Sequence, residues 1–223
     1  MCKILKRANP RALFHTDAVQ GFGKIPVTAD GTGADMISLS SHKIHGPKGM
    51  GALYIRRGIS IKPIMFGGGQ QGGMRSGTEN VPGIVGFGLA AKMATTDLSS
   101  KAERMTVLRK RLEKGIVNAL DNVRVNTPEN AAPHILNISF GGVKSEVLLH
   151  SLEMQNIFVS SGSACSSHKK EPSYVLTEIG VPRKMIDGSI RFSLSEFSTE
   201  EQVDAVIDAV NKIVPRLRRL GMR

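Results

Sequence analysis

Lys43 lies in a glycine-rich turn, SSHKIHGPKG, between two apolar runs at residues 36–41 and 51–57. Both runs are typical of β-strands, so the pattern predicts that a tight turn between strands holds this lysine in place. A lysine that forms a Schiff base needs an amine that is positioned and partly deprotonated. The turn therefore makes Lys43 a candidate for covalent chemistry; the alternative is an ordinary lysine of a surface turn.

Four further polar residues have types that suit an aromatic, phosphate-bearing ligand. Asp17 falls at the end of the strand expected at residues 12–18, where ligand sites of open α/β sheets concentrate. A carboxylate there can pair with a protonated pyridine nitrogen and keep the ring an electron sink. Gln20 could hydrogen-bond a ring hydroxyl, and Ser40 and His42 could donate to a phosphate. The alternatives are a turn carboxylate, a surface amide, and groups that satisfy the backbone of their own turn.

Thr78 belongs to a glycine-rich stretch, residues 63–83, that we expect to be a structured loop. Its hydroxyl and the nearby backbone N–H groups suit a phosphate, and the alternative role is helix capping. The stretch also contains a formal dinucleotide-binding fingerprint, Gly67-x-Gly69-x-x-Gly72. We reject that match because no acidic residue follows at the expected distance of about 20 residues and no helix starts immediately.

Cys165 lies among small polar residues in SSGSACSSHKK, a segment that we expect to be exposed. The neighbouring His168, Lys169 and Lys170 would favour the thiolate, the reactive form of cysteine. The pattern indicates a nucleophile or sulfur carrier; the alternative is an incidental thiol. Cys2 has no such surroundings, and we take it to be incidental.

Arg191 lies in a strand of otherwise apolar character, between Ile190 and Phe192. An arginine in such a strand needs a partner. A substrate carboxylate would serve as a bidentate one, and the alternative is an internal salt bridge.

The elements that position these residues follow from periodicity and turn signals. The last helix has a capping box, with Ser198 as N-cap and Glu201 three residues later, and we expect Pro215 to end its regular part. The order predicts an α/β domain at residues 1–92 and a smaller α+β domain at residues 93–223. The expected strands are at residues 12–18, 36–41, 51–57, 134–140, 157–162 and 189–194, and the expected helices start at residue 82, near residue 99, at residue 145 and after residue 198.

The formal net charge is +11, but the positive residues are scattered and aromatic residues make up 4% of the 223 residues. We therefore expect no nucleic-acid partner. No apolar run is long enough to span a membrane, so we expect no membrane partner. The two cysteines form no CxxC pair, which argues against a metal site. Isolated cysteines without a signal peptide favour a reducing, cytoplasmic location.

Four separated segments, HTDAVQ, SSHKIHGPKGMGALY, GGGQQGGMRSGTEN and SSGSACSS, followed by IRFSLSEFST, resemble the signature segments of the cysteine desulfurases. These are pyridoxal-phosphate enzymes of fold type I in the class-V aminotransferase family, with a mostly parallel sheet in the large domain. The SGSAC loop resembles the nitrogen-fixation and iron–sulfur-cluster assembly type. The resemblance covers essentially the whole chain.

The resemblance implies a role for each candidate residue. Lys43 would be the lysine that links to pyridoxal 5'-phosphate, and Cys165 the nucleophile that takes up sulfur as a persulfide. Arg191 would bind the substrate carboxylate. The remaining matches are Asp17 at the pyridine nitrogen, Gln20 at the ring oxygen, and the phosphate ligands Ser40, His42 and Thr78, the last donated by the other subunit of a homodimer.

The resemblance also implies an activity, the conversion of L-cysteine to L-alanine, with the sulfur passed to an iron–sulfur scaffold or another acceptor protein. The alternatives within the class are a selenocysteine lyase and a cysteine sulfinate desulfinase. Family members carry a long portion before the HTDAVQ strand, so we expect a C-terminal fragment that is inactive without a complementing N-terminal chain. The alternative from another class is a non-catalytic fragment that binds a full-length desulfurase or a scaffold protein.

Overall fold

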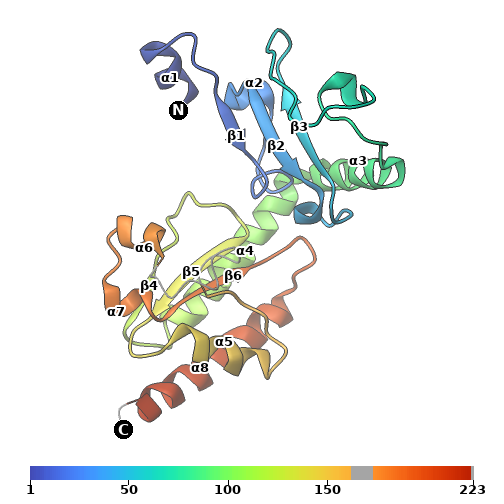
Figure 1. Ribbon diagram of the computed structural model, residues 1–223. Helices are drawn as coiled ribbons and strands as arrows, with labels where there is room; N and C mark the ends of the chain where they lie inside the picture. The colour runs from blue at the N-terminus through green and yellow to red at the C-terminus, as the bar shows by residue number, and fades with distance from the viewer. Residues whose placement is uncertain (162–172, 222–223) are drawn as a thin grey trace. The chain divides into compact units, whose positions relative to one another are not determined.

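The computed structural model describes residues 1–161 and 173–221 and has two compact units, Met1–Ser99 and Ser100–Arg223 (Figure 1). Each unit has a three-stranded sheet of its own. The domain boundary expected between residues 92 and 93 falls within helix α3 (Val81–Thr95). In the described part of the chain, no helix is both long and apolar enough to cross a membrane.

The sheet of the first unit has the order β1-β2-β3. β1 and β2 are parallel, whereas β2 and β3 are antiparallel. Helix α3 packs on the turn that follows β2, where Ile44 meets Phe87, Ala90 and Ala94 in a small cluster. The elements of this unit are α1 (Cys2–Ala8), β1 (His15–Asp17), α2 (Ala29–Thr32), β2 (Met36–Ser40), the 3-10 turn η1 (Ser41–Ile44), β3 (Gly51–Ile55), η2 (Gln71–Gly73) and α3.

The strand expected at residues 12–18 is shorter in the structure and begins at His15. The residues before it are used in a turn, because Ala12 donates its N–H to the carbonyl of Asn9 and accepts the ammonium of Lys6 at 2.7 Å. Backbone groups that serve a turn cannot pair in a sheet.

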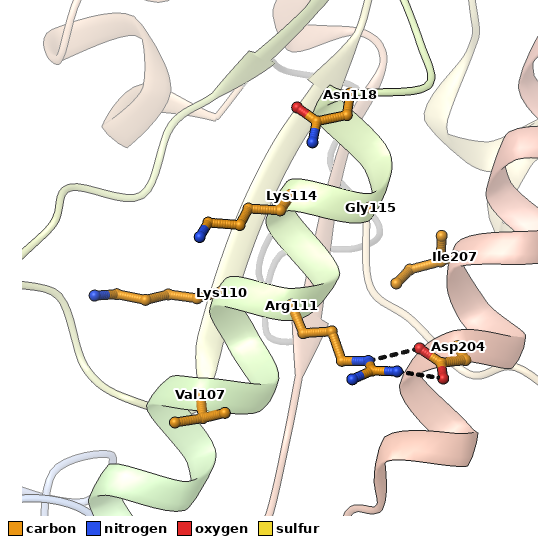
Figure 2. A pocket seen from close by; sticks show the side chains of 8 residues that line it. All are labelled: Val107, Lys110, Arg111, Lys114, Gly115, Asn118, Asp204 and Ile207. Carbon is orange, nitrogen blue, oxygen red and sulfur yellow. Dashed lines mark hydrogen bonds and ion pairs between the residues drawn. The ribbon is translucent and has the colours of Figure 1, made fainter.

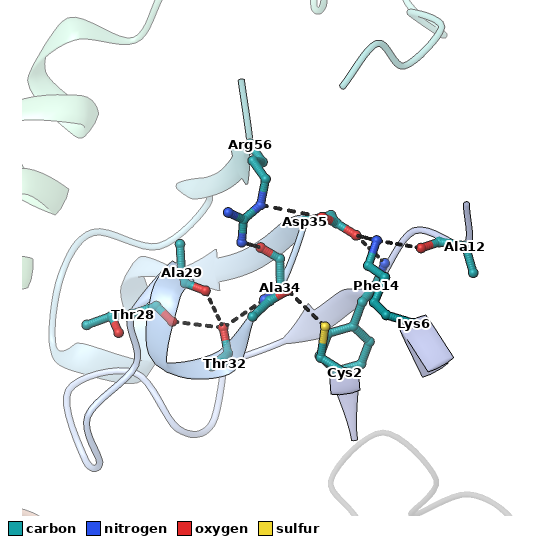
Figure 3. A network of polar contacts seen from close by, with 11 residues as sticks. Cys2, Lys6, Ala12, Phe14, Thr28, Ala29, Thr32, Ala34, Asp35 and Arg56 are labelled. Carbon is teal, nitrogen blue, oxygen red and sulfur yellow. Dashed lines mark hydrogen bonds and ion pairs between the residues drawn. The ribbon is translucent and has the colours of Figure 1, made fainter. Parts of the chain in front are cut away.

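Asp35 ties α1 to the sheet of the first unit (Figure 3). Its carboxylate accepts the ammonium of Lys6 and the backbone N–H of Phe14, each at 2.8 Å, and lies 3.4 Å from Nε of Arg56. The hydrogen bond from Lys6 and then that from Phe14 lower the pKa of Asp35, so the group stays ionised.

The second unit has an antiparallel sheet of order β4-β5-β6. Its main core is a cluster to which the sheet, α4, α5 and α8 contribute, with Phe140, Ile138 and Leu112 among its fully buried members, and Leu176, Val181 and Ile186 form a smaller cluster of their own. The elements are α4 (Leu98–Val117), which belongs to this unit from Ser100 on, β4 (Val123–Val125), β5 (Ile135–Phe140), α5 (Ser145–Glu153), α6 (Tyr174–Glu178), α7 (Arg183–Ile186), β6 (Ser189–Ser193) and α8 (Glu200–Gly221).

The expected capping box of the last helix is wrong by one residue. The hydroxyl of Thr199 accepts the N–H of Gln202 at 3.3 Å, and the side chain of Gln202 accepts the N–H of Thr199 at 3.1 Å. Ser198 lies one residue before the N-cap, and its hydroxyl accepts the N–H of Ser195 in the preceding turn.

Pro215 does not end the helix, which continues to Gly221. The proline removes only its own N–H from the ladder. The turns beyond it stay attached because Arg218 donates to the carbonyls of Gly141, at 2.9 Å, and Asn122, at 3.1 Å.

The strand expected at residues 157–162 is also wrong for residues 157–161, where only Ser160 pairs with another strand. Ile157 cannot pair through its N–H with another strand, because this N–H bonds to the carbonyl of Leu152 at the end of α5.

Candidate active site

Four of the predicted site residues lie at one edge of the first unit's sheet. β1 and β2 are parallel, so their carboxyl ends meet at the same edge. Asp17 is the last residue of β1 and Ser40 the last residue of β2. His42 and Lys43 follow at once in η1. Topology therefore gathers a carboxylate, a hydroxyl, an imidazole and an amine at the place where open α/β sheets bind ligands.

The turn that carries Lys43 is held on both sides. Lys43 itself is exposed, whereas Ser41 and Ile44 beside it are buried. The turn ends at His45, whose backbone lies in the left-handed region with φ of 64°, and Gly46 follows it. A Cβ on Gly46 would collide with Oγ of Ser41, so only glycine allows the backbone this close. The scaffold thus fixes the backbone of Lys43 and presents its amine to solvent.

The other groups at this edge keep free hydrogen-bonding capacity. Oδ1 of Asp17 accepts the N–H of Val19 at 2.9 Å, which orients the carboxylate and leaves its second oxygen available. Ser40 Oγ and His42 Nδ1 lie 2.8 Å apart in a hydrogen bond. Gln20 is exposed in the turn that follows β1. These donors and acceptors face solvent, as a ligand site requires.

Thr78 is exposed and lies three residues before α3. Its alternative role as a helix cap is excluded, because the cap is Asn80, whose side chain accepts the N–H of Gly83 at 3.1 Å. The described contacts do not bring Thr78 to the residues at the ends of β1 and β2.

Arg191 lies in β6 of the second unit, directly opposite Asn137 of β5. On its other side it exchanges two backbone hydrogen bonds with Ser160, at 2.8 and 3.1 Å, and its Nη2 donates to the hydroxyl of Ser160 at 3.3 Å. Nε of Arg191 is buried without an acceptor. No described carboxylate forms an ion pair with it, so the alternative of an internal salt bridge finds no support among the described residues.

The predicted nucleophile Cys165 lies outside the described residues, as do His168, Lys169 and Lys170. Cys2 is half-buried, and its thiol donates to the carbonyl of Gly33 at 3.1 Å.

The sequence analysis did not predict that Arg191 lies on a polar face of the second unit's sheet. Asn126 donates to Asn137 at 2.7 Å and to Ser139 at 2.8 Å, and Ser189 donates to Asn137 at 3.0 Å. The signal was present as polar residues at alternate positions, N-x-S in β5 and S-x-R in β6, which share one face of the sheet.

A hollow of about 600 Å³ opens between α4 and α8 in the second unit (Figure 2). Arg111 reaches from α4 to Asp204 of α8 with two bonds of 2.7 Å, whereas Lys110 and Lys114 point away from that pair. Asp204 raises the pKa of Arg111 through this bond. None of the predicted site residues that the structure describes lines the hollow, so we do not assign the predicted chemistry to it.

Comparison with known proteins gives a consistent result. A family model described as "Aminotransferase class-V" matches residues 1–206. A cysteine desulfurase of Trichormus azollae is 46% identical over 221 residues, 98% of this chain and 55% of that protein. A cysteine desulfurase IscS of Anaeromyxobacter sp. (strain K) is 47% identical over 212 residues, 94% of this chain and 52% of that protein.

Two solved structures are similar over nearly the whole chain. A NifS-like protein has a TM-score of 0.87 at 39% identity, covering 96% of this chain and 55% of that one. A NifS-like protein from Rickettsia africae has a TM-score of 0.84 at 36% identity, covering 96% and 56%. The chain thus spans about half the length of the relatives that it matches.

Proposed function

The chain belongs to the class-V aminotransferase family, and from this premise we propose that it supplies one part of a pyridoxal-phosphate-dependent cysteine desulfurase. The family and the fold class predicted from the sequence, α/β followed by α+β, are confirmed by the family match and by the NifS-like structures. The observation that carries the proposed activity is the gathering of Asp17, Ser40, His42 and Lys43 at the ends of β1 and β2.

These residues fit pyridoxal phosphate. Asp17, His42 and Lys43 are exposed, Ser40 is half-buried, and the lysine lies on a turn that only glycine at position 46 permits. When bound, the protonated pyridine ring of this cofactor withdraws electrons from the bonds of an attached amino acid. Lys43 would hold the cofactor covalently, and the carboxylate of Asp17 would keep a proton on the ring nitrogen.

The other residues would orient the cofactor and substrate. Gln20 would bond the ring oxygen, and Ser40 and His42 would donate to the phosphate. Thr78 would do the same from the partner subunit of a homodimer, because the described contacts within one chain do not bring it to this group. Arg191 would bind the carboxylate of L-cysteine, because its buried Nε lacks an acceptor and a guanidinium binds carboxylates in a bidentate manner.

We further propose that the thiolate of Cys165 attacks the sulfur of L-cysteine. An S–S bond forms on Cys165 while the C–S bond of the substrate breaks, and the carbon takes up a proton to give L-alanine. The persulfide sulfur then passes to an acceptor protein, such as an iron–sulfur scaffold. Two isolated cysteines suit a reducing, cytoplasmic location for this chemistry. The names of the relatives favour this activity over a selenocysteine lyase, a cysteine sulfinate desulfinase or a non-catalytic binding fragment.

The cofactor assignment is tested by adding pyridoxal phosphate to the chain mixed with the complementing half of a relative, reducing with borohydride and mapping the labelled peptides. We expect the adduct on Lys43. Lys48 is the internal control, because it is an exposed lysine of the same turn region. An adduct on Lys48 or elsewhere, with Lys43 unmodified, would show the assignment to be wrong.

A further inference from the structure

Asn137 and Arg191 lie directly opposite each other on β5 and β6 in the second unit. In the same ladder, Phe140 donates its N–H to the carbonyl of Gly188 at 3.0 Å, so these two residues form a hydrogen-bonded pair. Hydrogen-bonded and non-hydrogen-bonded pairs alternate along antiparallel strands, which makes Asn137 and Arg191 a non-hydrogen-bonded pair. The Cα atoms of such a pair are about 4.5 Å apart, and the two side chains leave the same face of the sheet.

The side-chain amide of Asn137 is held with its NH2 group as the free end. Its Oδ1 accepts the amide N–H of Asn126 at 2.7 Å and the hydroxyl of Ser189 at 3.0 Å. Since an amide is planar, Nδ2 lies on the other branch, away from these two donors. No described residue accepts a hydrogen bond from this Nδ2, and the atom is accessible to solvent. Asn137 thus presents N–H donors that lack a partner in the described part of the chain.

The guanidinium of Arg191 is also fixed at one end and open at the other. Its Nη2 donates to Oγ of Ser160 at 3.3 Å, and the backbone groups of the two residues pair at 2.8 and 3.1 Å. Its Nη1 has no acceptor among the residues that the structure describes, and it is accessible to solvent. A guanidinium and an amide NH2 group are both donors, so Arg191 and Asn137 cannot satisfy each other through these groups.

The polar face is closed on one side of this pair. Ser139 is fully buried, and Ser189 is 5% exposed. Their hydroxyls are used within the network, since Ser139 accepts the amide N–H of Asn126 at 2.8 Å and Ser189 donates to Asn137. The open N–H groups of Asn137 and Arg191 therefore form the part of this face that a ligand can reach.

A carboxylate is the ligand that fits these adjacent donors. An ionised carboxylate only accepts hydrogen bonds, and its two oxygens offer about four lone-pair sites. The fork of a guanidinium fills two of these sites, and a neighbouring amide N–H can fill a third. We propose that Asn137 donates its side-chain N–H to the carboxylate that Arg191 binds. The identity of the ligand, an amino acid such as L-cysteine or its product L-alanine, rests on the proposed function.

Two substitutions of Asn137 separate its donor from the network around it. Asn137→Asp keeps an oxygen that accepts from Asn126 and Ser189, but it replaces the NH2 group by a second oxygen. The new negative charge would pair with Arg191 and repel a carboxylate ligand. Asn137→Ala removes the donor and the acceptor together. A residue that only held the network would tolerate aspartate better than alanine, whereas a carboxylate donor would tolerate aspartate least.

The direct measurement is the binding of L-alanine to the 223-residue chain, followed through the side-chain nitrogen resonances of Asn137 and Arg191. L-Alaninol, which lacks the carboxylate, is the matched control ligand. We expect both resonances to shift saturably with L-alanine and neither to shift with L-alaninol. A shift of Arg191 without a shift of Asn137, or no shift of either, would overturn the proposal.

The variants are compared through the Arg191 resonance. The dissociation constant for L-alanine should rise at least about tenfold in Asn137→Ala, because a hydrogen bond to a charged group contributes about one to two powers of ten. It should rise at least about a hundredfold in Asn137→Asp, where repulsion is added. Binding by Asn137→Asp as tight as that of the unmodified chain would overturn the proposal. If Asn137→Ala unfolds the second unit, the aspartate variant decides, since it keeps the network.

In the complemented enzyme, the same variants should raise KM for L-cysteine in the same order. The turnover number kcat should change less than about threefold, because the carboxylate is bound alike before and during the reaction. Loss confined to kcat would overturn the proposal.

Asn126→Ala is the matched control for the network, because Ser189 still holds Asn137 in this variant. Its dissociation constant for L-alanine should stay within about threefold of that of the unmodified chain. Equal weakening in Asn126→Ala and Asn137→Ala would assign the effect to the network and overturn the proposal. Binding of L-alanine at Asn137 and Arg191 without labelling of Lys43 would overturn the proposed function and leave this inference intact.

Discussion

Replacing Gly188 by alanine should destabilise the second unit by about 2–4 kcal/mol. A Cβ at this position would collide with the carbonyl oxygen of Phe140 and lie 2.7 Å from that of Val143. Both atoms belong to the backbone and cannot swing aside as a side chain can. Overpacking of this kind costs about 1–3 kcal/mol. The bond from the N–H of Phe140 to the carbonyl of Gly188, now 3.0 Å long, would weaken and add about 1 kcal/mol.

The measurement is urea denaturation, and unfolding is monitored through hydrogen exchange at the amides of Ile138 and Ile190. These two amides report the second unit alone. Gly221→Ala is the matched control, because it makes the same chemical change in the same unit where a Cβ meets nothing within 4 Å. The control should stay within about 0.5 kcal/mol of the unmodified chain. If Gly188→Ala also changed the free energy of unfolding by less than about 0.5 kcal/mol, the backbone before β6 would be able to move and make room for the Cβ. The reasoning from the contact distances would then be refuted.

Two other predictions concern polar contacts. The pKa of Asp35 is lowered by Lys6 and Phe14, so its stabilising contribution should be present above the ordinary value of 3.8 and be lost as the pH falls through the lower folded pKa. Asp35→Asn should remove that acid-side loss, as measured by the urea midpoint of the first unit at decreasing pH; an unchanged pH profile would contradict it. In the complemented enzyme, Ser160→Ala should raise KM for L-cysteine about fivefold and change kcat little, because the hydroxyl orients Arg191 and a hydrogen bond contributes about 1 kcal/mol. Ser160→Thr, which keeps a hydroxyl, should restore KM, and a loss confined to kcat would argue against this role.

Local signals predicted much of the fold. The two apolar runs around the Lys43 turn do form β2 and β3, because strand propensity and a glycine-rich turn act over a few residues. The last helix likewise follows a local pattern, because Val203, Val210 and Val214 recur at helical spacing and are buried on one face. Such features depend on residues that lie within about two helical turns of one another in the sequence, so the sequence pattern alone predicts them.

The errors arose where distant contacts override local patterns. Pro215 does not end α8, because Arg218 binds carbonyls more than 70 residues away. The strand expected at residues 157–162 reduces, in its described part, to Ser160, whose pairing with Arg191 depends on the register of a distant strand. The polar face around Arg191 was not predicted for the same reason, although polar residues alternate along β5 and β6. The roles assigned to the site residues stay predictions.

The two units that carry the predicted site residues have cores of very different size. Arg191 stands on a sheet packed against a cluster of 17 buried residues, whereas the turn of Lys43 packs against a cluster of four and its sheet against a cluster of three. Burial of apolar surface stabilises roughly in proportion to its area, so the geometry around Arg191 is the self-supporting part. The Lys43 turn is the part that the complementing half would stabilise. Cofactor linkage at Lys43 should therefore respond to complementation, whereas the pairing of Arg191 with Ser160 should not.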